Sequence, residues 1–222
     1  MTYFADRIDA GKRLAATLTD LGDQNAIVLA IPRGGVVVGY QIADTLNLPL
    51  DVIISHKLGA PNNPEYAIGA ITEDGTTVLD NDINTCLTIT NQYLREESER
   101  QKKEIKRRLK TYRQNLPTPD LAGFHVILVD DGIATGSTMK AALYSVKNKN
   151  AATTTIAIPV GPPTTIQALK RQADRVICFH IPTFFQAVGR FYNNFNQTSD
   201  QEVIALLEKN RKKQIPKTFK KF

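Results

Sequence analysis

The sequence predicts an α/β fold, in which a parallel twisted sheet is flanked by helices. Short apolar runs rich in β-branched residues alternate with longer segments of helical periodicity, an order that favours parallel strands joined by right-handed crossovers. The run from His125 to Val129 has little polar alternation, so we expect a central strand covered on both faces. A length of 222 residues with 42% hydrophobic content suits one such domain with additions.

The first half of the chain contains two predicted strands of this sheet and a hairpin. Ile8, Leu14 and Leu18 follow helical spacing, and the segment from Ala26 to Ile31 is uniformly apolar. The turn sequence at 73–75 separates two short strand-like runs. The expected elements are a helix over residues 6–21, a strand over 26–31, a loop over 32–35, a helix over 36–46, a strand over 51–55, a loop over 56–66, and strands over 67–72 and 76–79.

The second half begins with a long charged helix, which we expect over about residues 84–115. After it come a strand from Phe124, a helix from Thr138, a strand over 153–159, a helix over 164–172 and a strand over 175–179. We therefore expect one domain over residues 1–208, followed by a basic tail over 209–222. The tail holds seven basic and no acidic residues; subtracting that charge from the net +6 leaves −1 for residues 1–208.

Composition favours a cytoplasmic protein without a membrane partner. No apolar run approaches the length of a membrane span, and the first residues lack a basic start followed by an apolar stretch. The two cysteines, Cys86 and Cys178, show no metal-ligand spacing. A short basic tail more often aids solubility than reads nucleic acid, so a nucleic-acid partner is not expected.

The stretch from Asp130 to Thr138 is the main candidate site. Two acids end the predicted central strand, and a loop with two glycines and three hydroxyls opens the next helix. Backbone N–H groups at a helix start bind phosphate, while the carboxylates suit sugar hydroxyls or Mg²⁺. An Asx turn with a helix cap is the alternative interpretation, but it explains only one acid and one hydroxyl.

Residues 126–138 resemble the motif with which type I phosphoribosyltransferases bind 5-phosphoribosyl 1-pyrophosphate (PRPP). The resemblance implies that Asp130 and Asp131 bind the ribose 2′ and 3′ hydroxyls. It also implies that the following loop wraps the 5′-phosphate. The PRPP-binding residues implied in this way are Asp130, Asp131, Gly132, Ile133, Ala134, Thr135, Gly136, Ser137 and Thr138.

A second motif, at residues 31–35, resembles the pyrophosphate loop of the same family, where a cis peptide is often found. Arg33 suits phosphate oxygens, and Gly34 and Gly35 expose backbone donors. Lys57 follows the next strand and suits the same pyrophosphate as a point charge. The resemblance implies catalytic roles for Asp131, Arg33 and Lys57.

The resemblance covers about residues 5–208 and implies a type I phosphoribosyltransferase-like fold with a small hood. It points to a poorly characterised bacterial branch, through residues 56–70 and 182–195. The implied reaction transfers the phosphoribosyl group of PRPP to a nitrogen nucleophile with release of pyrophosphate. Mg²⁺ is the implied cofactor, with Asp130 and Asp131 as candidate ligands, and a homodimer is expected. Where 6-oxopurine transferases carry an acid, this chain has Ala134, so the acceptor stays unidentified.

Three alternatives stay open at this point. A regulatory protein that senses PRPP without catalysis would use the same fold, with its basic tail on nucleic acid. The charged segment at 92–113 is either a solvated helix face with salt-bridge pairs, which a second subunit could cover, or a nucleic-acid surface that its acids disfavour. The aromatic residues between Phe184 and Phe195 form core or partner contacts, or line an acceptor pocket.

Overall fold

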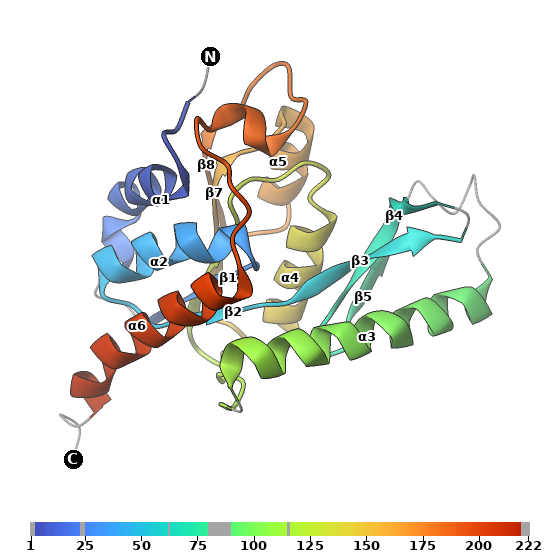
Figure 1. Ribbon diagram of the computed structural model, residues 1–222, viewed down its shortest axis with the longest axis horizontal. Coiled ribbons are helices and arrows are strands. Elements are labelled where there is room, and N and C mark those ends of the chain that lie inside the picture. The colour runs from blue at the N-terminus through green and yellow to red at the C-terminus, as the bar shows by residue number, and fades with distance from the viewer. Residues whose placement is uncertain (1–2, 23–24, 62, 80–89, 115, 219–222) are drawn as a thin grey trace.

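The main body of the protein is a five-stranded sheet in the order β2-β1-β6-β7-β8, and every neighbouring pair of strands is parallel (Figure 1). The computed structural model describes residues 3–22, 25–61, 63–79, 90–114 and 116–218. The five strands are β1 (Ala26–Ala30), β2 (Leu50–Val52), β6 (His125–Val129), β7 (Thr153–Val160) and β8 (Arg175–His180). The predicted parallel sheet is therefore confirmed.

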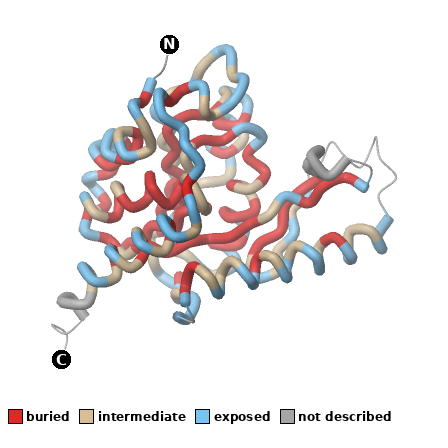
Figure 2. Tube along the Cα trace, in the orientation of Figure 1, coloured by how far each residue is buried: buried red, intermediate tan, exposed pale blue. Residues whose placement is uncertain are grey.

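Helices cover both faces of this sheet. On one face lie α1 (Arg7–Ala16), α2 (Gly34–Leu46) and α6 (Asp200–Thr218), whose buried residues share a core with Val28 and Ile127, and α6 itself contacts α2 and β2. On the other face lie α4 (Ser137–Asn148) and α5 (Pro163–Lys170), which pack on Ile27 and Leu128. Alternate residues of the central strands β1 and β6 thus enter different cores. β1 is buried along its length and β6 is buried from Val126 onward, inside the body that Figure 2 shows. A short 3-10 turn, η1 (Thr19–Leu21), follows α1.

A second sheet extends sideways from this body; we call it the lateral sheet. It consists of β3 (Ser55–Ala60), β4 (Asn63–Thr72) and β5 (Thr77–Leu79), all antiparallel. The helix α3 (Asn91–Arg113) runs along it (Figure 1). The predicted hairpin around residues 73–75 is confirmed as the β4–β5 turn, where Gly75 takes a φ of +84°.

The prediction of a loop over residues 56–66 is wrong. Residues 56–60 form most of β3 and pair with β4, for example His56 with Ile71. Glycine, proline and asparagine in this stretch suggested a loop, but the strand tolerates Gly59 because the register shifts there. The apolar side chains Leu58 and Ile68 are fully buried in the same core as the main body, and this burial stabilises the hairpin.

The helix α3 is shorter in the described residues than the expected span of 84–115. Thr90 caps its first turn by accepting a hydrogen bond from the Tyr93 N–H, and Gln114 ends it in the left-handed conformation. Residues 80–89 lie outside the described part of the chain, so the expected start at 84 is not tested. The side chains of Ile105 and Tyr112 are buried, which makes α3 a packed component of the fold rather than a free charged rod.

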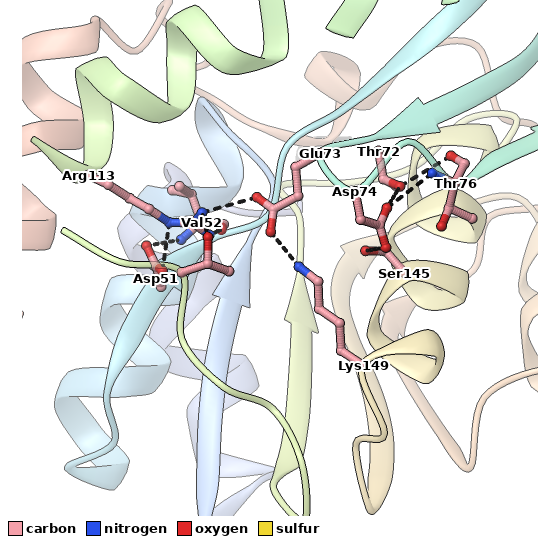
Figure 3. Close-up of polar contacts among 10 residues, drawn as sticks. Asp51, Val52, Thr72, Glu73, Asp74, Thr76, Arg113, Ser145 and Lys149 are labelled. Atoms are coloured by element: carbon pink, nitrogen blue, oxygen red, sulfur yellow. Dashed lines mark hydrogen bonds and ion pairs between the residues drawn. The ribbon is translucent and has the colours of Figure 1, made fainter. Parts of the chain in front are cut away.

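A buried ionic network fixes the base of the lateral sheet to the main body (Figure 3). Arg113, at the end of α3, donates to Asp51 at 2.9 Å, to the Val52 carbonyl at 2.9 Å and to Glu73 at 3.2 Å. Glu73 in the β4–β5 turn also pairs with Lys149. Burial raises the pKa of Asp51, and the charge of Arg113 opposes that rise. Four segments distant in sequence therefore meet at one guanidinium and one carboxylate.

A small hood lies over the carboxyl ends of the strands, as the fold prediction expects. The N-terminal segment at Phe4 pairs with Tyr192 beyond β8, and the Tyr3 and Phe4 N–H groups both donate to the Phe191 carbonyl at 2.9 Å. These aromatic residues share a small core with Val160. The segment after β8 also contains the 3-10 turn η2 (Val188–Phe191).

Helix α6 continues through the start of the expected basic tail. The helix runs to Thr218, and within it Asn210 is buried and donates to the Leu48 carbonyl while accepting from the Leu50 N–H. The division at residue 208 therefore falls inside a helix, and the domain boundary itself stays a prediction. Among the described helices, none combines the length and the apolar character that crossing a membrane requires.

Candidate active site

The two predicted motifs meet because β1 and β6 are neighbours. Ala30 and Val129 are paired at the carboxyl ends of these strands, and the Ile31 N–H donates to the Val129 carbonyl at 2.8 Å. A cavity of about 630 Å³ opens there, in the position where open α/β sheets bind ligands. Its walls are formed by Arg7, Ile31, Pro32, Arg33, Gly34, Ser55, Asp130, Asp131, Thr138, Val188, Phe195, Gln197 and Thr198.

Asp130 lies at the floor of this cavity. Its Oδ1 accepts the Asp131 N–H at 2.8 Å. Burial and the adjacent negative charge of Asp131 raise the pKa of Asp130 well above its usual range. The helix α2 approaches it closely, because a Cβ on Gly35 would lie 2.9 Å from the Asp130 Cα. Glycine at 35 is therefore required for the two motifs to touch.

Asp131 is held from two sides, by Arg7 and by Tyr192 of the predicted aromatic cluster, and neither contact was predicted. Its Oδ2 accepts from the Arg7 Nε at 2.7 Å, and both side chains are largely buried, 11% exposed for Arg7 and 16% for Asp131. The Tyr192 hydroxyl donates to the Asp131 carbonyl at 2.6 Å. Burial and the charge of Asp131 raise the pKa of Tyr192, so the phenol stays a donor at neutral pH.

The loop after Asp131 is held tightly by the neighbouring strand and helix. Gly132 and Gly136 have φ values of +152° and +77°, which other residues rarely adopt. The Ile133 N–H donates to the Val160 carbonyl at 3.0 Å, and Thr165 donates to the Ala134 carbonyl at 2.7 Å. The loop thus delivers the start of α4, where Thr138 lines the cavity.

The amino end of α4 suits an anion. The helix begins at Ser137, and its N-cap residue is Gly136, which has no side chain to cap it. Its first N–H groups and its dipole favour a negative ligand. The start of α2, at Gly34, lies on the same cavity. Two helix starts therefore place positive ends at one site, beside two carboxylates suited to hydroxyl groups.

Arg33 reaches the cavity from the second motif, and the peptide bond between Pro32 and Arg33 is cis. The guanidinium pairs with Asp200, the first residue of α6, at 3.7 Å. The Tyr112 hydroxyl of α3 donates to the same carboxylate at 2.6 Å. Burial, with the Asp200 carboxylate, raises the pKa of Tyr112 to about 12, so it remains a donor.

Not all predicted site residues line the cavity. Arg33, Gly34, Asp130, Asp131 and Thr138 do, and Gly35 lies behind them. Residues 132–137 form the loop that leads to Thr138, and they do not line the cavity themselves. Lys57 is exposed on β3 and shares a strand face with Ser55, two residues earlier, but it does not line this cavity.

Several wall residues were missed by sequence reasoning. Arg7 was expected only as part of a helix, and Gln197 and Thr198 carried no signal. The aromatic cluster divides between the two interpretations: Phe195 lines the cavity, Phe191 and Tyr192 are buried, and Phe184 is 90% exposed. The aromatic spacing in the sequence indicated the cluster but not which ring faces the site.

Asp130 and Asp131 are also the residues that suit magnesium. In the part of the chain that the structure describes, no group of three or more His, Cys, Asp or Glu side chains converges on one point. In phosphate-handling sites, however, Mg²⁺ is usually held by one or two carboxylates together with phosphates of the ligand. Two adjacent carboxylates beside two helix starts fit that mode of binding.

Comparison with known proteins agrees with this geometry. The model of a family described as "Phosphoribosyl transferase domain" matches residues 4–196. Two proteins of Mycobacterium tuberculosis, "Putative phosphoribosyl transferase Rv0571c" and "Putative phosphoribosyl transferase MT0597", are each 41% identical over 209 residues. These alignments cover 94% of this chain and 47% of each relative, so the chain spans about half the length of these relatives.

A solved structure gives the same result for the fold. The protein TT1426 from Thermus thermophilus is 39% identical, with a TM-score of 0.80 over 94% of this chain and 99% of that chain. The family match, the sequence relatives and this structure together cover the body, the hood and the cavity described above. The chain therefore belongs to the phosphoribosyl transferase domain family.

Proposed function

We propose that this protein transfers the 5-phosphoribosyl group of PRPP to a nitrogen nucleophile and releases pyrophosphate, with Mg²⁺ as cofactor. The observation that carries this proposal is the convergence of Asp130, Asp131, Arg33 and two helix starts on one cavity of about 630 Å³. A diol, a phosphate monoester and a pyrophosphate each find a matching set of groups there. A homodimer and a cytoplasmic location stay predictions.

In this proposal the ribose half of the ligand lies on the PRPP motif. Asp130 and Asp131 accept hydrogen bonds from the two ribose hydroxyls. The loop from Gly132 to Thr138 brings the start of α4 to the 5′-phosphate, and Thr138, which lines the cavity, donates to it. Because these contacts fix both ends of the sugar, C1′ is presented to the acceptor in a single orientation.

The leaving group lies on the second motif. As the bond to C1′ breaks, positive charge develops on the ribose ring and negative charge on pyrophosphate. Arg33 and the N–H groups at Gly34 and Gly35 stabilise that negative charge. Lys57 has weaker support, because it does not line the cavity. When bound, Mg²⁺ supplies further charge neutralisation at the departing phosphates, and Asp130 or Asp131 would hold it.

The acceptor lies under the hood, between Val188 and Phe195. Ala134 offers no acid to take a proton from a purine-like acceptor, and its carbonyl is engaged by Thr165. Between Val188 and Phe195 the cavity wall supplies one aromatic ring and apolar contacts. Position 134 supplies no ionised group. A nucleobase-like acceptor that already carries a free nitrogen lone pair fits these walls best.

The proposal is tested by incubating the protein with Mg-PRPP and a panel of nucleobases while pyrophosphate release is recorded. Release that requires one base identifies the transferase and its acceptor. Tight PRPP binding without release for any base contradicts the proposal and favours the alternative, a PRPP-sensing regulator. Absence of PRPP binding contradicts both. Calorimetry with ribose 5-phosphate checks the binding site without any acceptor. Heat of binding shows that the sugar phosphate binds and that the panel lacked the right base, whereas no heat shows that the site does not bind it.

A further inference from the structure

Arg7 makes a set of contacts at the cavity that the proposed reaction does not yet use. It lies in the first turn of α1, 124 residues before its partner Asp131. Its Nε donates to the Asp131 Oδ2 at 2.7 Å, and its Nη1 donates to the Asn196 carbonyl at 2.7 Å. Its guanidinium carbon lies 3.9 Å from the centre of the Phe195 ring. One side chain therefore touches the PRPP motif and the hood together.

The second motif also closes on this pair. A Cβ on Gly34 would lie 2.6 Å from the Arg7 Nε and closer still to the Asp131 carboxylate. The space around the ion pair is thus filled on the side of α2 by backbone alone. Arg7 has little freedom to move away from Asp131 without disturbing both neighbours.

A second arginine in the same helix shows what an ordinary ion pair looks like. Arg13 also pairs with an aspartate, Asp9, at 2.9 Å, and also lies over a ring, Phe4, at 5.5 Å. Its side chain is 42% exposed, however, and it does not line the cavity. Exposed pairs of this kind contribute little to stability or function. Arg13 even donates in the same pattern, from Nε to Asp9 at 2.9 Å and from Nη1 to the Tyr3 carbonyl at 3.3 Å. Arg7 differs from Arg13 in burial and in its partner, a carboxylate of the cavity wall.

We infer that Arg7 is a positioning residue, which holds the Asp131 carboxylate in place for the ribose hydroxyl and fixes the Phe195 wall beside it. This inference rests on the proposed function. A carboxylate accepts about four hydrogen bonds, so the bond from Arg7 leaves capacity for the ligand while it restricts rotation of the group. Ribose recognition and the shape of the acceptor wall are then set by the same guanidinium.

The test is a thermodynamic cycle on binding, measured by calorimetry with two ligands, ribose 5-phosphate and 2-deoxyribose 5-phosphate. The second ligand lacks one hydroxyl of the diol. The unchanged protein is expected to prefer ribose 5-phosphate by about tenfold, as a hydrogen bond to a charged group provides. The inference includes that the hydroxyl missing from the second ligand, the 2-hydroxyl, is the one that Asp131 binds. In Arg7→Met the preference is therefore expected to fall to about twofold or less, because Asp131 is no longer held for that hydroxyl.

Arg13→Met is the matched control and is expected to keep the full preference. Arg7→Lys keeps a positive charge near Asp131 but loses the fork that reaches Asn196, so an intermediate ratio is expected. If Arg7→Met does not fold, Arg7→Lys carries the test, and a ratio equal to that of the unchanged protein overturns the inference.

A purely structural role for Arg7 predicts a different result. Both ligands would then weaken by the same factor in Arg7→Met and the ratio would be unchanged, which overturns the inference. Failure of the proposed function is distinguishable, since the unchanged protein would then bind neither sugar phosphate. The ratio, rather than either affinity alone, is therefore the decisive quantity.

Discussion

The two halves of the cavity are held very differently. In the ribose half, Asp131 and Arg7 are 2.7 Å apart, and their side chains are 16% and 11% exposed. In the pyrophosphate half, Arg33 and Asp200 are 3.7 Å apart, and their side chains are 35% and 38% exposed. One pair is buried and tightly bonded, whereas the other is open to solvent and loosely bonded.

This difference matches what each half must do in the proposed reaction. The sugar needs a fixed orientation, and a rigid carboxylate pair provides it at the cost of placing two acids together. The leaving group must depart, so its cation is better held by a weak pair that the ligand displaces. In the proposed reaction, ribose recognition is therefore built into the folded chain, while the leaving-group site is completed by the ligand.

The largest expected effect on ribose binding comes from a side chain at position 34 that crowds the Asp131–Arg7 pair. Gly34→Val places a side chain where the Asp131 carboxylate and the Arg7 Nε lie. Overpacking of this kind costs about 1–3 kcal/mol, so ribose 5-phosphate affinity is expected to fall by about a hundredfold. Calorimetry measures the affinity. Gly22→Ala is the control, because a Cβ there has no contact nearer than 3.6 Å; equal affinities in the two variants would contradict the prediction.

The second prediction separates the two halves. Arg33→Met removes the cation that faces the leaving group but leaves the Asp131 pair intact. Turnover with PRPP, measured as kcat/KM, is expected to fall by about a hundredfold, as when one stabilising donor for a developing charge is removed. Affinity for ribose 5-phosphate is expected to change by less than about twofold. A parallel loss of that affinity would mean that the halves are not independent.

The third prediction concerns the cost of the acid pair. The pKa of Asp130 is raised in the folded protein, so the folded state binds its proton more tightly than the unfolded state does. Stability is therefore lost as the pH rises from the ordinary carboxyl pKa through the folded pKa. Asp130→Asn removes this loss, and its Tm at pH 7 in metal-free buffer is expected to rise by about 3 °C, or roughly 1 kcal/mol.

The same variant has an internal control. Below the ordinary carboxyl pKa both states of the unchanged protein carry a protonated Asp130, so the gain in Tm should vanish there. The Asp130→Asn variant is also expected to bind ribose 5-phosphate more weakly than the unchanged protein does at pH 7. A Tm that is unchanged at pH 7, measured by scanning calorimetry, would show that the folded protein holds Asp130 without strain.

Sequence reasoning named the consecutive residues of each motif but not the partners that hold them, for a physical reason. Asp130, Asp131 and the loop after them are consecutive, so their chemistry is visible in one stretch at the end of an apolar strand. Arg7 and Asp200 come from the first turns of two helices, where charged residues are ordinary. Only the packing of α1 and α6 in the folded chain brings Arg7 to the cavity wall and Asp200 to within 3.7 Å of Arg33.

The lateral sheet shows a second limit of sequence reasoning. Its β4–β5 turn was predicted because Glu73, Asp74 and Gly75 form a recognisable hairpin signal. The strand β3 was missed because it contains Gly59 and is followed directly by Pro61. The burial that stabilises it involves Ile105, from a helix that begins more than 30 residues later. Pairing at long range thus outweighed local preference.

The smallest expected effect tests whether Tyr112 helps to hold Arg33 through Asp200. Tyr112→Phe removes the hydroxyl that donates to Asp200 at 2.6 Å and leaves the buried ring in place. Asp200 would then hold Arg33 less firmly, and kcat is expected to fall by about twofold, since a single hydrogen bond acting through a second residue is involved. Tyr40→Phe, which also loses a hydroxyl bonded to an aspartate, is the control. A fall in ribose 5-phosphate affinity instead of kcat would place Asp200 in the rigid half, and the contrast between the two halves would then fail.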